Sequence, residues 1–127
     1  MKEKIVFVVD DDKLIQHFLE YSLIGKEGFS VRIFQRAEDC LKSMNAKPDL
    51  IIMDHSFMFN DETLMSGLEA IVEIRNIDKQ VPVIILSKSE DKELIADYES
   101  KGATAYIAKE GCFINKLFDT FDELILQ

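Results

Sequence analysis

Four short apolar segments constrain the fold of this 127-residue chain most strongly, because each is followed by a residue suited to binding phosphate or metal. The segments and the residues after them are 5–9 with Asp10 and Asp11, 50–53 with Asp54, 83–86 with Ser87, and 105–108 with Lys109. In an open parallel sheet the carboxyl ends of all strands lie at one edge, where such folds bind ligands. We therefore expect these five side chains to converge.

The segments between the apolar runs have apolar residues spaced three and four apart, which predicts helices. The first helix would carry Phe18 on its apolar face and the third Val72, while Ser89 would be the N-cap of the fourth. Alternation over residues 29–34 predicts one more strand. Five repeats of strand then helix predict an α/β fold, a doubly wound five-stranded parallel sheet with helices on both faces.

Length and composition favour a single domain over residues 1–127. No apolar run approaches the roughly 18 residues that a membrane-spanning helix needs, and residues 1–4 lead directly into a strand without a signal peptide. We therefore expect a cytoplasmic protein that does not insert into membranes. The formal charge of −9 disfavours direct binding of nucleic acid. The two cysteines, Cys40 and Cys112, lack metal-ligand spacing and are interpreted as reduced thiols.

The expected set of side chains points to phosphoryl chemistry. Asp10, Asp11 and Asp54 would place three carboxylates together, which is costly unless a cation intervenes. Mg²⁺ is the simplest such cation, since it binds a few carboxylates and takes further ligands from phosphate. Asp54 is the candidate nucleophile that would form an aspartyl phosphate. The Lys109 ammonium and the Ser87 hydroxyl would stabilise the phosphoryl oxygens. Asp12 is interpreted as a helix cap.

Four motifs resemble the response-regulator receiver domain over essentially the whole chain. They are Val-Asp-Asp-Asp at 9–12, Pro-Asp-Leu-Ile-Ile-Met-Asp at 48–54, Pro-Val-Ile-Ile-Leu-Ser at 82–87, and the segment 102–109 that ends at Lys109. The resemblance implies the flavodoxin-like strand order 2-1-3-4-5. It also implies that Asp10, Asp11 and Asp54, with the backbone carbonyl of Ser56, bind Mg²⁺. Asp54 would receive its phosphoryl group from a sensor histidine kinase or a histidine phosphotransfer protein.

The resemblance further implies a two-state switch rather than an enzyme that turns over external substrates. After phosphorylation of Asp54, Ser87 would move toward the new oxygens and Tyr106 would turn inward. The output surface on the fourth helix, fifth strand and fifth helix would offer Ile95, Tyr98 and Tyr106 to a downstream protein target, or to a second copy in a phosphorylation-dependent dimer. For Tyr98, ordinary helix packing remains an equal alternative.

The chain departs from the family pattern in two places. Twelve residues, 55–66, separate Asp54 from Gly67, and their apolar side chains either fold onto the third helix or form a partner-binding lid. Asp61 or Glu62 of this segment could reach the metal. Glu110 stands where the family commonly has proline. His55 would point to the opposite face and take no catalytic part. The rival hypotheses are a receiver-like interaction module that is not phosphorylated and, ranked last, a Mg²⁺-dependent phosphatase.

Overall fold

The computed structural model describes residues 4–10, 12–24, 28–55, 66–88, 90–111 and 113–125. Strands and helices alternate along the chain. They are β1 (Lys4–Val9), α1 (Lys13–Ile24), β2 (Phe29–Phe34), α2 (Ala37–Lys42), a 3-10 turn η1 (Met44–Ala46), β3 (Leu50–Asp54), α3 (Gly67–Ile77), β4 (Val83–Ser87), α4 (Lys92–Ser100), β5 (Ala105–Ala108) and α5 (Phe113–Ile125). No helix in these ranges is long and apolar enough to cross a bilayer.

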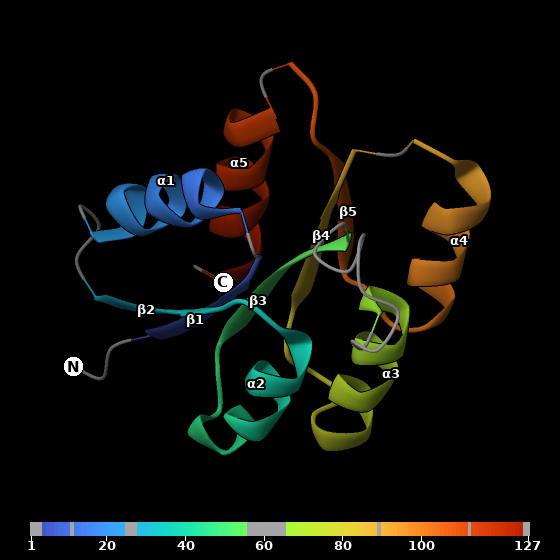
Figure 1. Cartoon of the computed structure of the whole chain (residues 1–127), viewed down its shortest axis with the longest axis horizontal. Helices are drawn as coiled ribbons and strands as arrows, with labels where there is room; N and C mark the ends of the chain where they lie inside the picture. Colours follow the sequence, from blue (N-terminus) through green and yellow to red (C-terminus); the bar gives the residue numbers. More distant parts are fainter. Residues whose placement is uncertain are drawn as a thin grey trace.

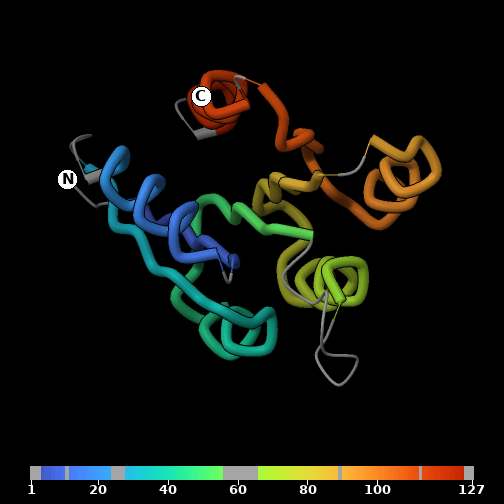
Figure 2. Tube along the Cα trace, turned by 45° about the horizontal axis from the view of Figure 1, so that its top comes forward, coloured from blue at the N-terminus to red at the C-terminus, as the bar shows by residue number. Residues whose placement is uncertain are grey.

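The five strands form one parallel sheet in the order β2-β1-β3-β4-β5. The strand order expected from the resemblance is therefore confirmed. Every residue of β3 and β4 is buried, as continuous Val, Ile and Leu content predicts for strands covered on both faces. Helices α1 and α5 cover one face of the sheet and α2, α3 and α4 the other (Figure 1, Figure 2).

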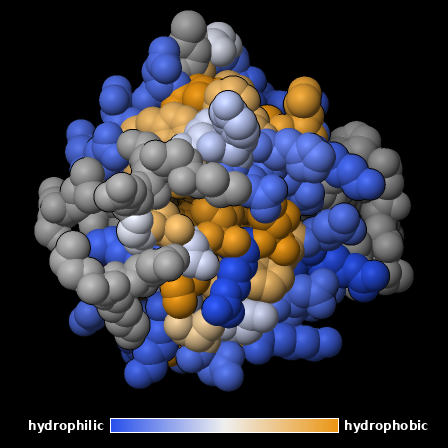
Figure 3. Space-filling model, turned by 90° about the vertical axis from the view of Figure 1, so that its left-hand side faces the viewer, coloured by the Kyte–Doolittle hydropathy of each residue, from blue (hydrophilic) through white to orange (hydrophobic). Residues whose placement is uncertain are grey.

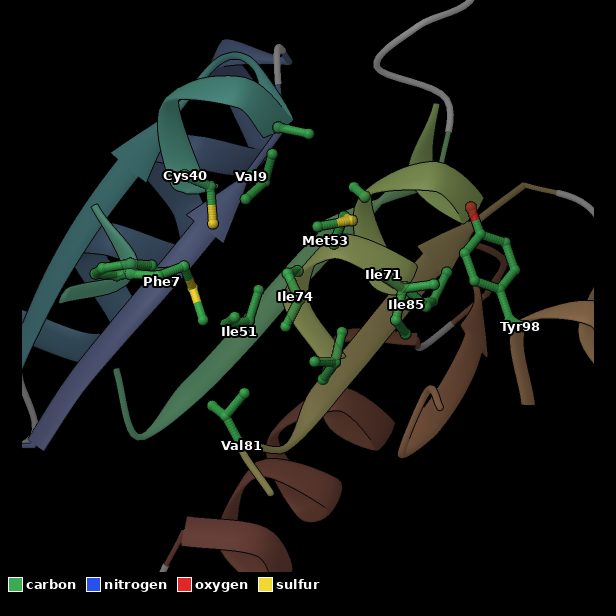
Figure 4. Close-up of a cluster of buried hydrophobic side chains, with 14 residues drawn as sticks. Phe7, Val9, Cys40, Ile51, Met53, Ile71, Ile74, Val81, Ile85 and Tyr98 are labelled. Atoms are coloured by element: carbon green, nitrogen blue, oxygen red, sulfur yellow. The ribbon is translucent and has the colours of Figure 1, made fainter. Parts of the chain in front are cut away.

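Each face of the sheet has its own apolar core, because successive strand residues point to opposite sides. On the face of α1 and α5, the buried side chains are Val6, Val8, Leu19, Leu23, Leu50, Ile52, Ile84, Leu86, Ile107, Leu117 and Phe121. On the opposite face, α2, α3 and α4 pack against a second cluster that runs from Phe7 and Cys40 to Tyr98 (Figure 4). The two cores fix the position of the sheet between its helices. The carboxyl ends of the strands are therefore held in place by the buried side chains on both faces.

The edge strand β2 is less covered than the central strands. Five of its six residues are half-buried and Arg32 is exposed. In the view of Figure 3, apolar side chains gather in the middle of the face at the level of β2, framed by polar ones. Partial cover of this kind is usual for a strand that pairs on one side only.

Three details of the helices differ from the sequence expectation. Phe18 and Val72 are 45% and 39% exposed, so neither lies on the buried face of its helix. The N-cap of α4 is Asp91, whose carboxylate accepts the backbone N–H of Glu93, and not Ser89. Asp12 does cap α1 as expected, since its side chain accepts the backbone N–H of Leu14 at 2.9 Å. In α1 and α3 the face formed by apolar residues is wider than the part of that face that packs against the sheet.

Arg75 ties the end of α3 to the turn that precedes β5. Its guanidinium donates to the carbonyl oxygen of Gly102 through Nε (3.0 Å) and Nη2 (2.8 Å). Nη1 donates to the carbonyls of Asp78 and Val81 at 3.1 and 2.7 Å. Five donors in a planar fork make arginine suited to such a cluster of carbonyls. The side chain therefore fixes the approach to β5, the strand that ends at Lys109.

Candidate functional site

The register of the sheet brings the strand ends together at its carboxyl edge. Val9 pairs with Met53, so Asp10 and Asp54 follow in adjacent positions of neighbouring strands. On the other side Asp54 pairs with Leu86, one residue before Ser87. Ser87 pairs with Ala108, one residue before Lys109. The convergence of Asp10, Asp54, Ser87 and Lys109 that the sequence predicts is therefore present in the structure.

The Lys109 ammonium lies between two buried carboxylates. Its Nζ is 2.8 Å from Oδ1 of Asp54 and 3.5 Å from Oδ2 of Asp10. The Lys109 side chain is 7% exposed and each carboxylate 1%. Two anions and one cation removed from water leave a net negative charge in the site, which is costly. Such a site attracts a further cation.

Of the two carboxylates, that of Asp10 shows the clear electrostatic destabilisation of its ionised form. Burial, and then the charge of Asp54, raise the pKa of Asp10 to about 7. Its Oδ1 accepts the backbone N–H of Asp12 at 2.8 Å, whereas its buried Oδ2 has no hydrogen-bond partner in the described part of the chain. A buried carboxylate oxygen without a hydrogen bond is a natural ligand for a hard cation such as Mg²⁺.

The backbone around Asp10 is held from both sides. Its N–H donates to the carbonyl of Phe34 at 3.0 Å, and its own carbonyl accepts the side-chain amide of Gln16 on α1. Gln16 is only 7% exposed. The sequence signals Gln16 only weakly, as a polar residue one helical turn after Asp12. It fixes the direction from which Asp10 enters the site.

Ser87 and Lys109 are linked through the backbone. The N–H of Lys109 donates to the Ser87 carbonyl at 2.6 Å, which continues the pairing of β4 and β5 beyond Ala108. Ser87 is 1% exposed. The peptide bond before Glu110 is trans, as are the others in the described ranges. The side chain of Lys109 nevertheless reaches both carboxylates.

Tyr98 and His55 form a contact that the sequence does not predict. Tyr98 is fully buried, so in this structure it offers no surface to a partner, and the packing alternative describes it better. Its hydroxyl forms a hydrogen bond with Nδ1 of His55, the residue after Asp54. Burial raises the pKa of Tyr98 and lowers that of His55. Ile95 and Tyr106, the other residues of the expected output surface, are half-buried.

Several expected site residues lie outside the described residues. They are Asp11, Ser56, Asp61 and Glu62; Cys112, interpreted as a reduced thiol, also lies outside the described ranges. The two interpretations of the segment 55–66 also concern mainly residues 56–65, which are outside the described ranges. Among the residues that are described, no group of three or more His, Cys, Asp or Glu side chains forms a metal site. Of the four expected metal ligands, the structure describes two, Asp10 and Asp54.

Comparison with known proteins identifies close resemblance over most of the chain. The model of the response regulator receiver domain matches residues 6–119. The DNA-binding transcriptional regulator NtrC of Proteus hauseri is 34% identical over 110 residues, which are 86% of this chain and 22% of the regulator. The KDP operon regulator KdpE of Escherichia coli is 35% identical over 108 residues, 82% of this chain and 44% of the regulator. The chain thus spans less than half the length of these relatives.

Solved structures with the same fold include three informative ones. A putative response regulator from Chloroflexus aurantiacus superposes with a TM-score of 0.80 at 24% identity, covering 99% of this chain and all of that one. The receiver domain of a Pseudomonas aeruginosa sensor histidine kinase, with magnesium in its active site cleft, has a TM-score of 0.78 at 22% identity, covering 98% and 99%. A Saccharomyces cerevisiae receiver domain bound to a histidine phosphotransfer protein has a TM-score of 0.80 at 21% identity, covering 98% and 90%.

Proposed function

Because this chain belongs to the family of response-regulator receiver domains, we propose that Asp54 accepts a phosphoryl group from a phosphohistidine. One observation carries the proposal: the buried Asp54 carboxylate lies 2.8 Å from the Lys109 ammonium, beside a second buried carboxylate. A nucleophile with a neighbouring fixed cation is what phosphoryl transfer requires from a protein. Residues 1–127 would act as a single receiver domain.

In the proposed step, a carboxylate oxygen of Asp54 attacks phosphorus, and the bond from phosphorus to the imidazole nitrogen of the donor breaks. The electron pair of that bond leaves with the imidazole, and no redox partner is needed. The phosphoryl oxygens would then lie near the Lys109 ammonium and the Ser87 hydroxyl. The Lys109 ammonium is already 2.8 Å from the Asp54 carboxylate before the reaction, so it needs little reorganisation to stabilise the charge that develops there, whereas the Ser87 hydroxyl, at the end of β4, would turn toward that charge.

The residues fit a divalent metal ion. Oδ2 of Asp10 is buried without a hydrogen bond, and Asp54 lies beside it on the neighbouring strand. Asp10 and Asp54, with Asp11 and the Ser56 carbonyl that the family resemblance adds, would hold Mg²⁺. When bound, the ion would offset the charge of the carboxylates and of the incoming phosphoryl oxygens. A neutral or basic pH favours such binding, since Asp10 must be ionised to serve as a ligand.

The phosphoryl donor would be a sensor histidine kinase or a histidine phosphotransfer protein. The domain would meet this donor in the cytoplasm. The solved complex of a yeast receiver domain with a phosphotransfer protein supports this class of partner. Phosphorylation would then bias Ser87 and Tyr106 between two arrangements and so alter the surface of α4, β5 and α5, including Ile95. A downstream protein target, or a second copy of the domain, would read that surface.

The test is intact-mass analysis after incubation with acetyl phosphate, in Mg²⁺ or in EDTA. The wild type should gain one phosphoryl group only in Mg²⁺. Asp54→Asn should gain none, while Asp119→Asn, a matched change at an exposed position of α5, should behave as wild type. Normal uptake by Asp54→Asn would disprove the site. No uptake by a folded wild type, together with no binding of beryllofluoride, would favour an interaction module.

A further inference from the structure

We infer that Tyr98 is a positioning residue that couples Asp54 to helix α4 through His55. The inference rests on the proposed function, since it concerns how phosphorylation of Asp54 reaches the rest of the domain. It depends on a series of contacts that the described residues make: Asp54 is bonded to His55, His55 to Tyr98 by a hydrogen bond, and Tyr98 touches Tyr106.

Tyr98 is the main anchor of α4. It is the one buried residue of this helix, whose nine residues are all described. Its ring lies at the edge of the cluster of Figure 4, with the hydroxyl oxygen directed toward α3. The position of α4 over the sheet therefore depends on where the Tyr98 ring is held.

The polar end of the ring is held by His55. A buried hydroxyl without a partner costs free energy, and here the partner is Nδ1 of the imidazole. The two rings also meet edge to face, with centroids 5.4 Å apart and an interplanar angle of 89°. Hydrogen bond and ring contact together fix the orientation of both side chains.

Gly67, the first residue of α3, leaves room for this pair. A Cβ atom at Gly67 would overlap the Tyr98 hydroxyl and lie 3.6 Å from Nδ1 of His55. The start of α3 is fixed in turn by the capping box of Ser66 and Glu69. The pair thus lies between the end of β3, the first residue of α3 and α4, and a shift of one of these elements would change the contact with the others.

His55 follows the phosphoacceptor directly, so a change in the backbone of Asp54 moves the anchor of its imidazole. At the other end, the Tyr98 and Tyr106 ring centroids are 5.9 Å apart. The same tyrosine therefore contacts both the neighbour of Asp54 and the β5 residue that borders α4. A displacement at the end of β3 would reach α4 and β5 through these side chains.

The experiment measures hydrogen–deuterium exchange of the α4 amides in Mg²⁺, with and without beryllofluoride as a phosphoryl mimic. In the wild type, beryllofluoride should change this exchange. In Tyr98→Phe, which removes only the hydroxyl, α4 of the free protein should exchange about fivefold faster, the effect of one ordinary hydrogen bond. Its response to beryllofluoride should fall below half that of the wild type.

Matched variants separate coupling from simple destabilisation. Tyr21→Phe removes the hydroxyl of a tyrosine that is 83% exposed on α1 and should behave as wild type. His55→Asn keeps a hydrogen-bonding group near the position of Nδ1 and should retain the response, whereas His55→Leu should lose it. In the double variant His55→Leu with Tyr98→Phe, the response should fall no further than in either single variant.

Intact mass after acetyl phosphate is measured on the same proteins, so that the two proposals can fail separately. Phosphoryl uptake with the same α4 response in wild type and Tyr98→Phe would overturn the coupling and leave the proposed function standing. A wild type that neither takes a phosphoryl group nor responds to beryllofluoride would overturn both. The expected result is uptake by all of these proteins, with an α4 response below half that of the wild type in Tyr98→Phe, His55→Leu and their double variant, and a wild-type response in Tyr21→Phe and His55→Asn.

Discussion

Among the described residues of the site, Asp10 carries the negative charge that burial disfavours most. Its carboxylate is 1% exposed, and Lys109 is shared with Asp54. The raised pKa of about 7 means that ionised Asp10 lowers the stability of the metal-free fold. This penalty is absent below the ordinary pKa of the group and grows as the pH rises toward 7. A neutral side chain of the same shape would avoid it.

Asp10→Asn is therefore expected to stabilise the metal-free protein at pH 8 by about 2 kcal/mol, because Asn keeps the acceptor for the Asp12 N–H without the buried charge. The advantage should disappear near pH 4. Urea unfolding in EDTA at the two pH values measures it, with Asp119→Asn as the exposed control. A less stable Asp10→Asn at pH 8 would show that Asp10 is already well compensated by Lys109.

Cys40 provides a second test at this scale, away from the site. Burial raises the pKa of its thiol to about 12 from an ordinary value of 9.0. The folded protein holds this proton where the unfolded chain loses it, so stability should fall as the pH rises from 9 toward 12. The extra loss should approach about 1.4 kcal/mol per pH unit.

The control for this prediction is Cys40→Ala, which lacks the thiol and leaves Cys112 unchanged. Urea unfolding midpoints of the two proteins are compared between pH 8 and 11. The stability difference between them should narrow as the pH rises, although the variant starts lower because of the cavity it creates. Parallel pH profiles would contradict the burial of Cys40.

At the scale of elements, the start of α3 matters because it encloses the contact of His55 and Tyr98. Its capping box comprises two hydrogen bonds: Ser66 Oγ accepts the Glu69 N–H at 3.1 Å, and Glu69 Oε1 accepts the Ser66 N–H at 3.3 Å. Ser66→Ala should cost about 1 kcal/mol in urea unfolding. Ser100→Ala, at the exposed end of α4, should cost less. Equal costs would mean that the cap does not hold α3.

The strands could be predicted more completely than the faces of the helices. Runs such as 83–86 are apolar throughout because both sides of the strand are covered, so they mark β4 without ambiguity. In α1, Phe18 fits the three-and-four spacing of the predicted apolar face as well as Leu19 and Leu23 do. It is nevertheless 45% exposed, while the two leucines are buried. Periodicity gives the width of an apolar face and not which edge of it meets the sheet.

The candidate site was predictable where it depends on strand ends and not where it depends on contacts between elements. Asp10, Asp54, Ser87 and Lys109 each follow an apolar run, and the topology alone brings them together. The contact of Tyr98 with His55 joins residues 43 positions apart on different elements. No local pattern pairs these two residues, so their hydrogen bond becomes visible only in the packed structure.

For the whole molecule, the fold holds two buried carboxylates at one edge while metal is absent, and binding a cation should stabilise it. At a free Mg²⁺ concentration tenfold above the dissociation constant, the gain is about 1.4 kcal/mol, or about 4 °C in Tm. Differential scanning calorimetry in Mg²⁺ and in EDTA measures this. Asp10→Asn should lose most of the gain and Asp119→Asn none of it. Equal shifts in wild type and Asp10→Asn would remove Asp10 from the metal site.

The most direct test of the account is to trap the phosphorylated residue. Borohydride reduces an acyl phosphate to an alcohol and leaves a free carboxylate unchanged, so a phosphorylated aspartate becomes homoserine. After acetyl phosphate and Mg²⁺, peptide mapping of the reduced protein should find homoserine at position 54 and aspartate at position 10. Homoserine at another position with Asp54 unmodified would contradict the assignment of Asp54 as the phosphoacceptor.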